Sequence, residues 1–196
     1  MNTLRMLYRS SKGFSVYELM VALGLMGIIA GLAVPAYQDA IEKRQITNGA
    51  EQIVAFVSTV QTESIKRNRM ATVSYASQED GNWCIGAVLG QTPCDCLETE
   101  PAASGFCSID STVWVLRDSD VQAKNLVSSV SGDGSYAFDP IRGMFIDPAD
   151  MLVLGLNSGA GQFQMNLSVI NTGRVALCLP TPSDDIPGFT ACPQGL

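Results

Sequence analysis

The chain contains no histidine. Histidine is the commonest general base near neutral pH and supplies the imidazole ligands of most catalytic zinc sites, so its absence argues against many kinds of enzyme. Positive charge is also scarce, because 12 lysines and arginines stand against 19 aspartates and glutamates and leave a net charge of −7. A general nucleic-acid binder needs a basic face. The composition therefore disfavours histidine-dependent catalysis and general nucleic-acid binding.

Acidic residues are missing from the first thirteen positions, which form a short basic leader. Its charges are Arg5, Arg9 and Lys12. An apolar run from Leu19 to Val34 follows. The 23 residues from Phe14 to Ala36 extend roughly 35 Å as a helix, which suffices to cross a bilayer core of about 30 Å. The basic leader predicts that Met1–Gly13 stays cytoplasmic and that the rest of the chain faces outward.

The order of leader and apolar run differs from that of an ordinary secretory signal, whose cleavage site follows the apolar region at small residues. Here the small residue at a plausible cut, Gly13, precedes the run, so the apolar segment stays on the mature protein. The segment from Lys12 to Glu18 thereby resembles the prepilin leader of type IV pilins and type II secretion pseudopilins. The resemblance implies that a membrane prepilin peptidase cuts between Gly13 and Phe14. It also implies that Phe14 becomes a methylated amino terminus.

Glu18 is an unusual residue for such a segment. A carboxylate within a membrane span costs up to a few kcal/mol at mid-depth and usually marks function. The resemblance assigns Glu18 to pairing with the amine of Phe14, one helical turn away in the same chain or in a neighbouring subunit. The alternative is that Glu18 reaches the headgroup region from near the helix end.

A single long helix is predicted from Phe14 to about Arg69. After Pro35, which is expected to kink the helix rather than end it, the chain has no proline before Pro93. Glycines at 27 and 31 have a spacing that lets membrane helices approach closely. The outer half carries an apolar stripe at spacings of three and four: Ile46, Ala50, Ile53, Val54, Val57 and Val60. We expect this stripe to pack on a globular domain.

Beyond Met70 the pattern changes to short strands separated by glycine, proline and aspartate. The predicted strands are Ala71–Ala76, Cys84–Leu89, Thr112–Leu116, Ser135–Phe138, Met151–Leu156, Phe163–Ile170 and Val175–Leu179. The stretch from Val127 to Ser135 is predicted to be a flexible turn, and that from Gln91 to Ser111 a cross-linked loop. The strands should form an antiparallel sheet on the outer half of the helix. The predicted segments are a leader (1–13), an apolar helix half (14–36), an amphipathic helix half (37–69) and a globular β-rich domain (70–196).

The six cysteines predict disulfide bonds in an exported domain: Cys84, Cys94, Cys96, Cys107, Cys178 and Cys192. A Cys₄ metal site is the weaker interpretation, because zinc ribbons have two residues between the cysteines of each pair. Cys178 with Cys192 is the preferred pair. Cys84 with Cys107 is a further candidate that leaves Cys94 and Cys96 open, so the firm prediction is oxidation.

Elements of the globular part narrow the resemblance. They are Thr62–Asn68 at the helix end, Trp83 with Gly86, Phe138 to Gly143, and Asn171 to Val175 leading into Cys178. This set resembles GspH/FimT-type minor pseudopilins and minor pilins. The resemblance implies an α+β pilin fold. The residues themselves lead us to expect no catalytic residue, no metal and no cofactor. Gly143 and Gly173 are expected at turns that need unusual backbone angles, and Trp83 and Trp114 are expected in core or rim packing.

The predicted function is structural. The resemblance implies a minor subunit of a type IV pilus or a type II secretion pseudopilus, located at or near the tip. Its implied partners are other pilin or pseudopilin subunits, the prepilin peptidase and the inner-membrane assembly platform. The chain would wait as a single-pass inner-membrane protein with a periplasmic domain and then enter the filament.

Three other functions compete with the structural one. DNA capture during natural transformation would use Arg174, Lys66, Arg67 and Arg69, yet Val175 and Ala176 follow Arg174 where the corresponding family motif has a second arginine. Catalysis by the acid pairs Asp118/Asp120 or Asp147/Asp150 lacks an accompanying nucleophile and base. A calcium site among Asp133, Asp139 and Asp147 lacks a recognised loop spacing.

Overall fold

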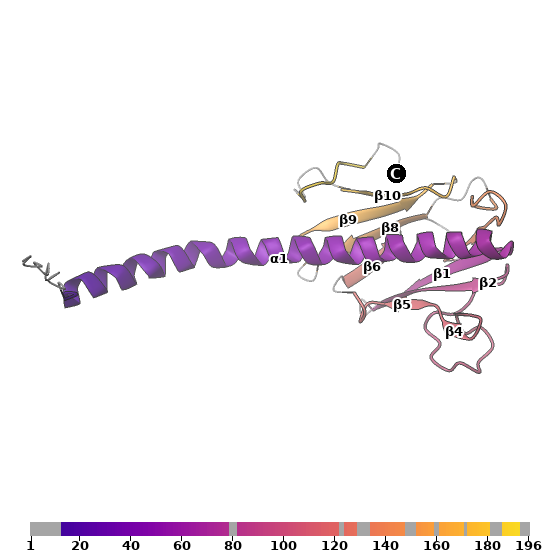
Figure 1. Ribbon diagram of the computed structural model, residues 1–196, viewed down its shortest axis with the longest axis horizontal. Coiled ribbons are helices and arrows are strands. Elements are labelled where there is room, and N and C mark those ends of the chain that lie inside the picture. The colour runs from indigo at the N-terminus through magenta and orange to yellow at the C-terminus, as the bar shows by residue number, and fades with distance from the viewer. Residues whose placement is uncertain are drawn as a thin grey trace, which may run out of the picture. The chain divides into compact units, whose positions relative to one another are not determined.

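A computed structural model describes residues 13–78, 82–121, 124–128, 134–147, 152–158, 161–170, 172–180 and 186–192. The chain divides between Ala40 and Ile41 into two compact units. Helix α1 (Val16–Arg67) contributes to both, and all strands belong to the second (Figure 1). The predicted leader up to Lys12 lies outside the described residues.

Both ends of α1 are set by local hydrogen bonds. Ser15 is the N-cap, and its Oγ accepts the backbone N–H of Tyr17 at 3.3 Å. At the other end Asn68 adopts a left-handed conformation with φ of 49°. Its N–H donates to the carbonyl of Ile65, and the N–H of Arg69 donates to the carbonyl of Ser64. This pair of bonds is a Schellman motif, so the helix ends close to the predicted position.

The outer half of α1 buries the predicted stripe. Ile46, Ala50, Ile53 and Val60 are completely buried, and Val57 is almost so. Val54, at the margin of the stripe, is half-buried. These residues share one core with side chains from both large sheets. The amphipathic pattern therefore identified the face of the helix that packs on the globular domain.

The described strands form two four-stranded antiparallel sheets and one short hairpin (Figure 1). The first sheet has the order β5 (Val115–Arg117), β2 (Trp83–Leu89), β1 (Ala71–Ser77) and β7 (Ser135–Phe138). The second has the order β10 (Val175–Cys178), β9 (Gln164–Val169), β8 (Leu152–Asn157) and β6 (Lys124–Ser128). The hairpin pairs β3 (Ser108–Ile109) with β4 (Thr112–Val113).

The α+β class, with one long helix and antiparallel strands, confirms the prediction from sequence, but three details differ. The expected single sheet is two sheets. The expected strand from Thr112 to Leu116 is interrupted at Trp114, whose N–H donates to Cys107 and whose carbonyl accepts from Ala87. The expected turn begins too early, since Val127 and Ser128 belong to β6, which pairs with β8. Residues 129–133 of that turn lie outside the described chain.

The cysteines form three disulfides: Cys84–Cys96, Cys94–Cys107 and Cys178–Cys192. The preferred pair, Cys178 with Cys192, is confirmed, whereas Cys84 with Cys107 is wrong. Asp95 and Phe106 form a parallel bridge, which brings the adjacent Cys94 and Cys107 together with a Cα–Cα distance of 5.1 Å. Cys96 is left to meet Cys84 on β2. The fold of the loop, which the spacing does not reveal, decides this connectivity.

Candidate functional site

The first half of α1 presents an apolar surface without protein cover. Phe14 is 77% exposed, and most of the described apolar side chains of the first unit are exposed as well. The large ones are Val16, Tyr17, Leu19, Met20, Val21, Leu23, Leu25, Met26, Ile28, Ile29, Leu32, Val34 and Tyr37. By length and composition α1 can cross a membrane, and its most apolar 18-residue window has a mean hydropathy of 2.3. Such a surface marks a membrane or protein contact.

Glu18 lies in the first turn of this helix and is exposed. It occupies the third helical position after the Ser15 N-cap, where a negative charge interacts favourably with the helix dipole. Within the described residues no cation pairs with Glu18. Gly13 and Phe14 precede the helix and are also exposed. The predicted cleavage point and the predicted amine-pairing residue therefore share one accessible end of α1.

Gln61 joins the end of α1 to loops from both sheets. Its Nε2 donates to the carbonyl of Gly143, which follows β7, at 2.6 Å. Gly173, in the turn between β9 and β10, packs against the same contact: a Cβ added there would lie 2.2 Å from the Gly143 oxygen and 2.4 Å from Gln61 Nε2. Both glycines have positive φ, 64° and 78°, which confirms their prediction as turn residues. Gln61 was missed, although a polar residue beside the apolar stripe was a usable signal.

The loop that carries Gly143 is built around Asp139. The Oδ1 atom of Asp139 accepts the N–H groups of Ile141 at 2.7 Å and Arg142 at 2.9 Å. The N–H of Arg142, followed by that of Ile141, stabilises the ionised carboxyl and lowers the pKa of Asp139. Asp139 thus shapes a turn. Nothing in its contacts suggests a calcium ligand, and Asp133 and Asp150 lie outside the described residues.

Asp120, from the predicted acid pair Asp118/Asp120, has a similar local role. Asp120 accepts the N–H of Arg117 at 2.9 Å, which caps the end of β5. Within the described residues no group of three or more cysteine, aspartate or glutamate side chains could hold a metal ion. Asp120 therefore provides turn geometry, while Asp150 of the second pair lies outside the described residues.

The four cations considered for DNA contact do not form one patch of free charge. Lys66 contacts Glu63 at 3.1 Å, and Arg67 pairs with both Glu63 and Asp110. A side-chain hydrogen bond from Arg67 lowers the pKa of Glu63, and one from Lys66 lowers it further. Hydrogen bonds to Glu63 and Asp110 in turn raise the pKa of Arg67. Arg69 and Arg174 are exposed and have no carboxylate partner in the described part of the chain.

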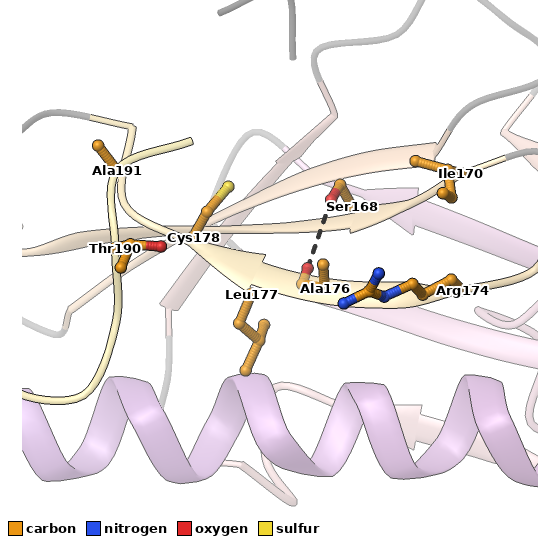
Figure 2. A pocket seen from close by; sticks show the side chains of 8 residues that line it. All are labelled: Ser168, Ile170, Arg174, Ala176, Leu177, Cys178, Thr190 and Ala191. Carbon is orange, nitrogen blue, oxygen red and sulfur yellow. Dashed lines mark hydrogen bonds between the residues drawn. The ribbon is translucent and has the colours of Figure 1, made fainter. Parts of the chain in front are cut away.

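Arg174 borders a cavity of about 380 Å³ beside β9 and β10 (Figure 2). The cavity is lined by Ser168, Ile170, Arg174, Ala176, Leu177, Cys178, Thr190 and Ala191. Figure 2 shows Leu177 pointing toward α1, whereas the Arg174 side chain lies along the strand near Ala176. The cavity therefore combines a largely apolar lining with one guanidinium.

The family described as Type II transport protein GspH matches residues 49–173. The chain belongs to this family. The match begins in the outer half of α1 and ends at Gly173, so it includes the Gln61–Gly143–Gly173 contact. In this GspH-family chain β10 and Arg174 lie just beyond the matched region.

Relatives with pilin names match parts of the chain. A fimbrial protein of Pseudomonas aeruginosa is 30% identical over 78 residues, which are 40% of this chain and 49% of that protein. The type IV major alpha-pilin of Moraxella bovis is 29% identical over 103 residues, 53% of this chain and 60% of that one. The chain thus spans about half the length of the first of these relatives, 49%. A crystal structure of the Pseudomonas aeruginosa type IV minor pilin FimU shows 19% identity and a TM-score of 0.46, covering 76% of this chain and 96% of that one.

Proposed function

We propose that this GspH-family chain is a minor subunit of a type IV pilus or type II secretion pseudopilus that acts at or near the filament tip. The observation that carries the proposal is the exposed apolar half of α1, which begins beside an accessible glycine and contains one carboxylate. Such a surface is stable only within a bilayer or against other proteins. A filament subunit uses both environments in turn.

In this proposal the prepilin peptidase cuts between Gly13 and Phe14, and the new amine at Phe14 is methylated. The span from 14 to 36 then holds the protein in the inner membrane, with the second unit in the periplasm. The assembly platform transfers the chain into the filament, where apolar helix halves pack together. Burial of apolar surface, worth about 25 cal/mol per Å², favours the helix in either environment.

Glu18 gives the assembled helix its register. An unpaired carboxylate within an apolar bundle is costly, and a neighbour's Phe14 amine removes that cost only where the two groups meet. Subunits that stop at other axial positions leave the charge unpaired. The amine exists only after cleavage, which makes processing a condition for stable packing.

The test is recruitment of the full-length chain into filaments in cells that make the other subunits. Glu18→Ala should reduce recruitment, whereas Glu51→Ala, which changes an exposed acid on the outer half of the same helix, should not. Mass spectrometry of the recruited protein should find an amino terminus at methylated Phe14. Normal recruitment of Glu18→Ala would refute the pairing, and an untrimmed Met1 in filaments would refute the whole proposal.

DNA capture at the tip is the competing proposal, and the exposed Arg174 is the observation in its favour. Lys66 and Arg67 are already paired with acids, and the net charge of −7 opposes approach of a polyanion. A gel-shift titration of the full chain in detergent at low salt decides the matter. No retardation at micromolar protein would end this idea.

A further inference from the structure

We propose that the free edge of β10 binds a short extended strand of a neighbouring filament subunit, and that an acidic side chain of that strand pairs with Arg174. The inference rests on the proposed function and names a partner surface for it. It is carried by three features of the described residues: an unpaired sheet edge, the cavity next to that edge, and an unpaired guanidinium at the rim.

The register of β10 shows which backbone groups are free. Ile170 N–H donates to the carbonyl of Arg174, so Ala176 faces Ser168 as a hydrogen-bonded pair. Val175 and Leu177 alternate with these residues, and their N–H and C=O groups point away from β9. In the described chain no backbone or side-chain group pairs with them on that side. A strand edge of this kind is a template for another strand.

Two other sheet edges in the described structure are covered over part of their length. At β7 the carbonyl of Ala137 accepts the N–H of Ile146, and Phe138 forms a bridge with Phe145. At β5 the side chain of Asp120 occupies the N–H of Arg117. Local turns or side chains block pairing at β7 and at the end of β5, whereas the middle of β10 has no such cover among the described residues.

Among the described residues, cover along this edge begins at Leu179, the residue after β10. Its N–H donates to Thr190, and its carbonyl accepts the N–H of Cys192, while the Cys178–Cys192 disulfide holds the two segments together. This segment, residues 190–192, occupies the edge and is called the wall here, because an added strand must stop where it begins. The open stretch from Val175 to Leu177 accommodates about three residues, roughly 10 Å of strand.

The chemistry of the edge favours a peptide over a nucleic acid. Val175 and Leu177 each offer a donor and an acceptor, and a peptide strand satisfies both, while a phosphate supplies acceptors only. The cavity lies beside Ser168, Ile170 and Ala176, so alternate side chains of the incoming strand have an apolar place to pack. Arg174 is the charged group at the rim, and an acidic residue complements it.

Proline at Val175 tests the backbone pairing directly. It removes only an N–H that points away from β9, and proline is tolerated at the first residue of an edge strand. Val175→Ala is the matched control, because it loses side-chain packing but keeps the N–H. In full-length chains coexpressed with the other subunits, Val175→Pro should reduce recruitment into filaments about tenfold relative to Val175→Ala, and Arg174→Glu should act in the same direction.

Folding is monitored separately by non-reducing electrophoresis of the Cys178–Cys192 bond. Ala176→Pro should disturb that bond, because it removes an N–H used within the sheet. If Val175→Pro and Val175→Ala both form the Cys178–Cys192 bond and are recruited equally, the inference is overturned. The proposed function stands in that case, provided that the wild type is cleaved and recruited. Failure of the wild type to enter filaments overturns both. DNA retardation that is lost with Arg174→Glu but unchanged with Val175→Pro would assign the cavity to nucleic acid and reject the strand.

Discussion

The side-chain amide of Gln61 donates a hydrogen bond to the backbone carbonyl of Gly143 across 2.6 Å. The two residues are 82 positions apart, and Gly173 packs against the same pair. One polar side chain at the end of α1 therefore fixes a loop from each of the two large sheets. This contact lies inside the region that matches the GspH family.

Gly173→Ala should destabilise the chain far more than Gly161→Ala. Both glycines have positive φ, 78° and 74°, so alanine costs about 1–2 kcal/mol at either position. A Cβ at Gly161 meets open space, whereas one at Gly173 overlaps the Gly143 oxygen and Gln61. Chemical denaturation of the full chain in detergent measures the difference. Equal midpoints for the two variants would contradict the packing described here.

Ser158→Ala should lower the free energy of unfolding by about 1–3 kcal/mol, the cost of leaving buried polar groups unpaired. Ser158 is 1% exposed. Its Oγ accepts the N–H groups of Gln162 and Phe163 and donates to Glu42 on α1 at 2.9 Å. Glu42→Gln keeps an acceptor for the serine and serves as the milder comparison. If both changes shift the denaturation midpoint equally, the serine does not organise this loop.

Asp139 should make the stability of its turn depend on pH in the acid range. Its pKa in the folded chain lies below the ordinary value of 3.8. The stabilisation is therefore present above that value and disappears as the pH falls through the lower pKa. Asp139→Asn keeps the acceptor oxygen but does not titrate. The stability advantage of wild type over this variant should shrink as the pH falls from about 5 to below 3.8. A constant difference would argue against an ionised Asp139 in the turn.

Peptide mapping under non-reducing conditions should recover the links Cys84–Cys96 and Cys94–Cys107. Gly86→Ala should impair their formation, because its Cβ would lie 2.3 Å from Cys107 Sγ and 2.9 Å from Cys96 Cβ. Gly90→Ala is the comparison: its positive φ of 140° strains the backbone, but a Cβ there meets open space and no cysteine. A link between Cys84 and Cys107 in wild type would reject the connectivity described here.

Loss of the terminal disulfide through Cys178→Ala with Cys192→Ala should cost about 3 kcal/mol, the chain-entropy value for a loop of this size. The bond closes a sequence separation of 14. The same change should weaken recruitment into filaments if the wall beside β10 positions the incoming strand. Thermal unfolding of the double variant and of wild type gives the first quantity, and filament fractionation gives the second.

Periodicity sufficed to predict the elements whose signals are local. The stripe from Ile46 to Val60 follows the helical repeat, and α1 ends at Arg67, just before Asn68, a residue that tolerates left-handed angles. The alternation through β9 identified its buried face, with Met165, Leu167 and Val169 inside. The strands β3 and β6 escaped prediction because β3 has only two residues and β6 depends on pairing with residues of β8 that are 26 or more positions away.

The sequence by itself determined the long helix, its apolar and amphipathic halves and the oxidised state of the cysteines, because each follows from the order or spacing of neighbouring residues. Only the tertiary structure decided how Cys84, Cys94, Cys96 and Cys107 pair, how the strands divide into two sheets, and that Gln61 meets Gly143 and Gly173. These features require segments distant in the chain to arrive at one place. Loop conformation and sheet register determine these long-range contacts, and local sequence patterns do not predict either of them.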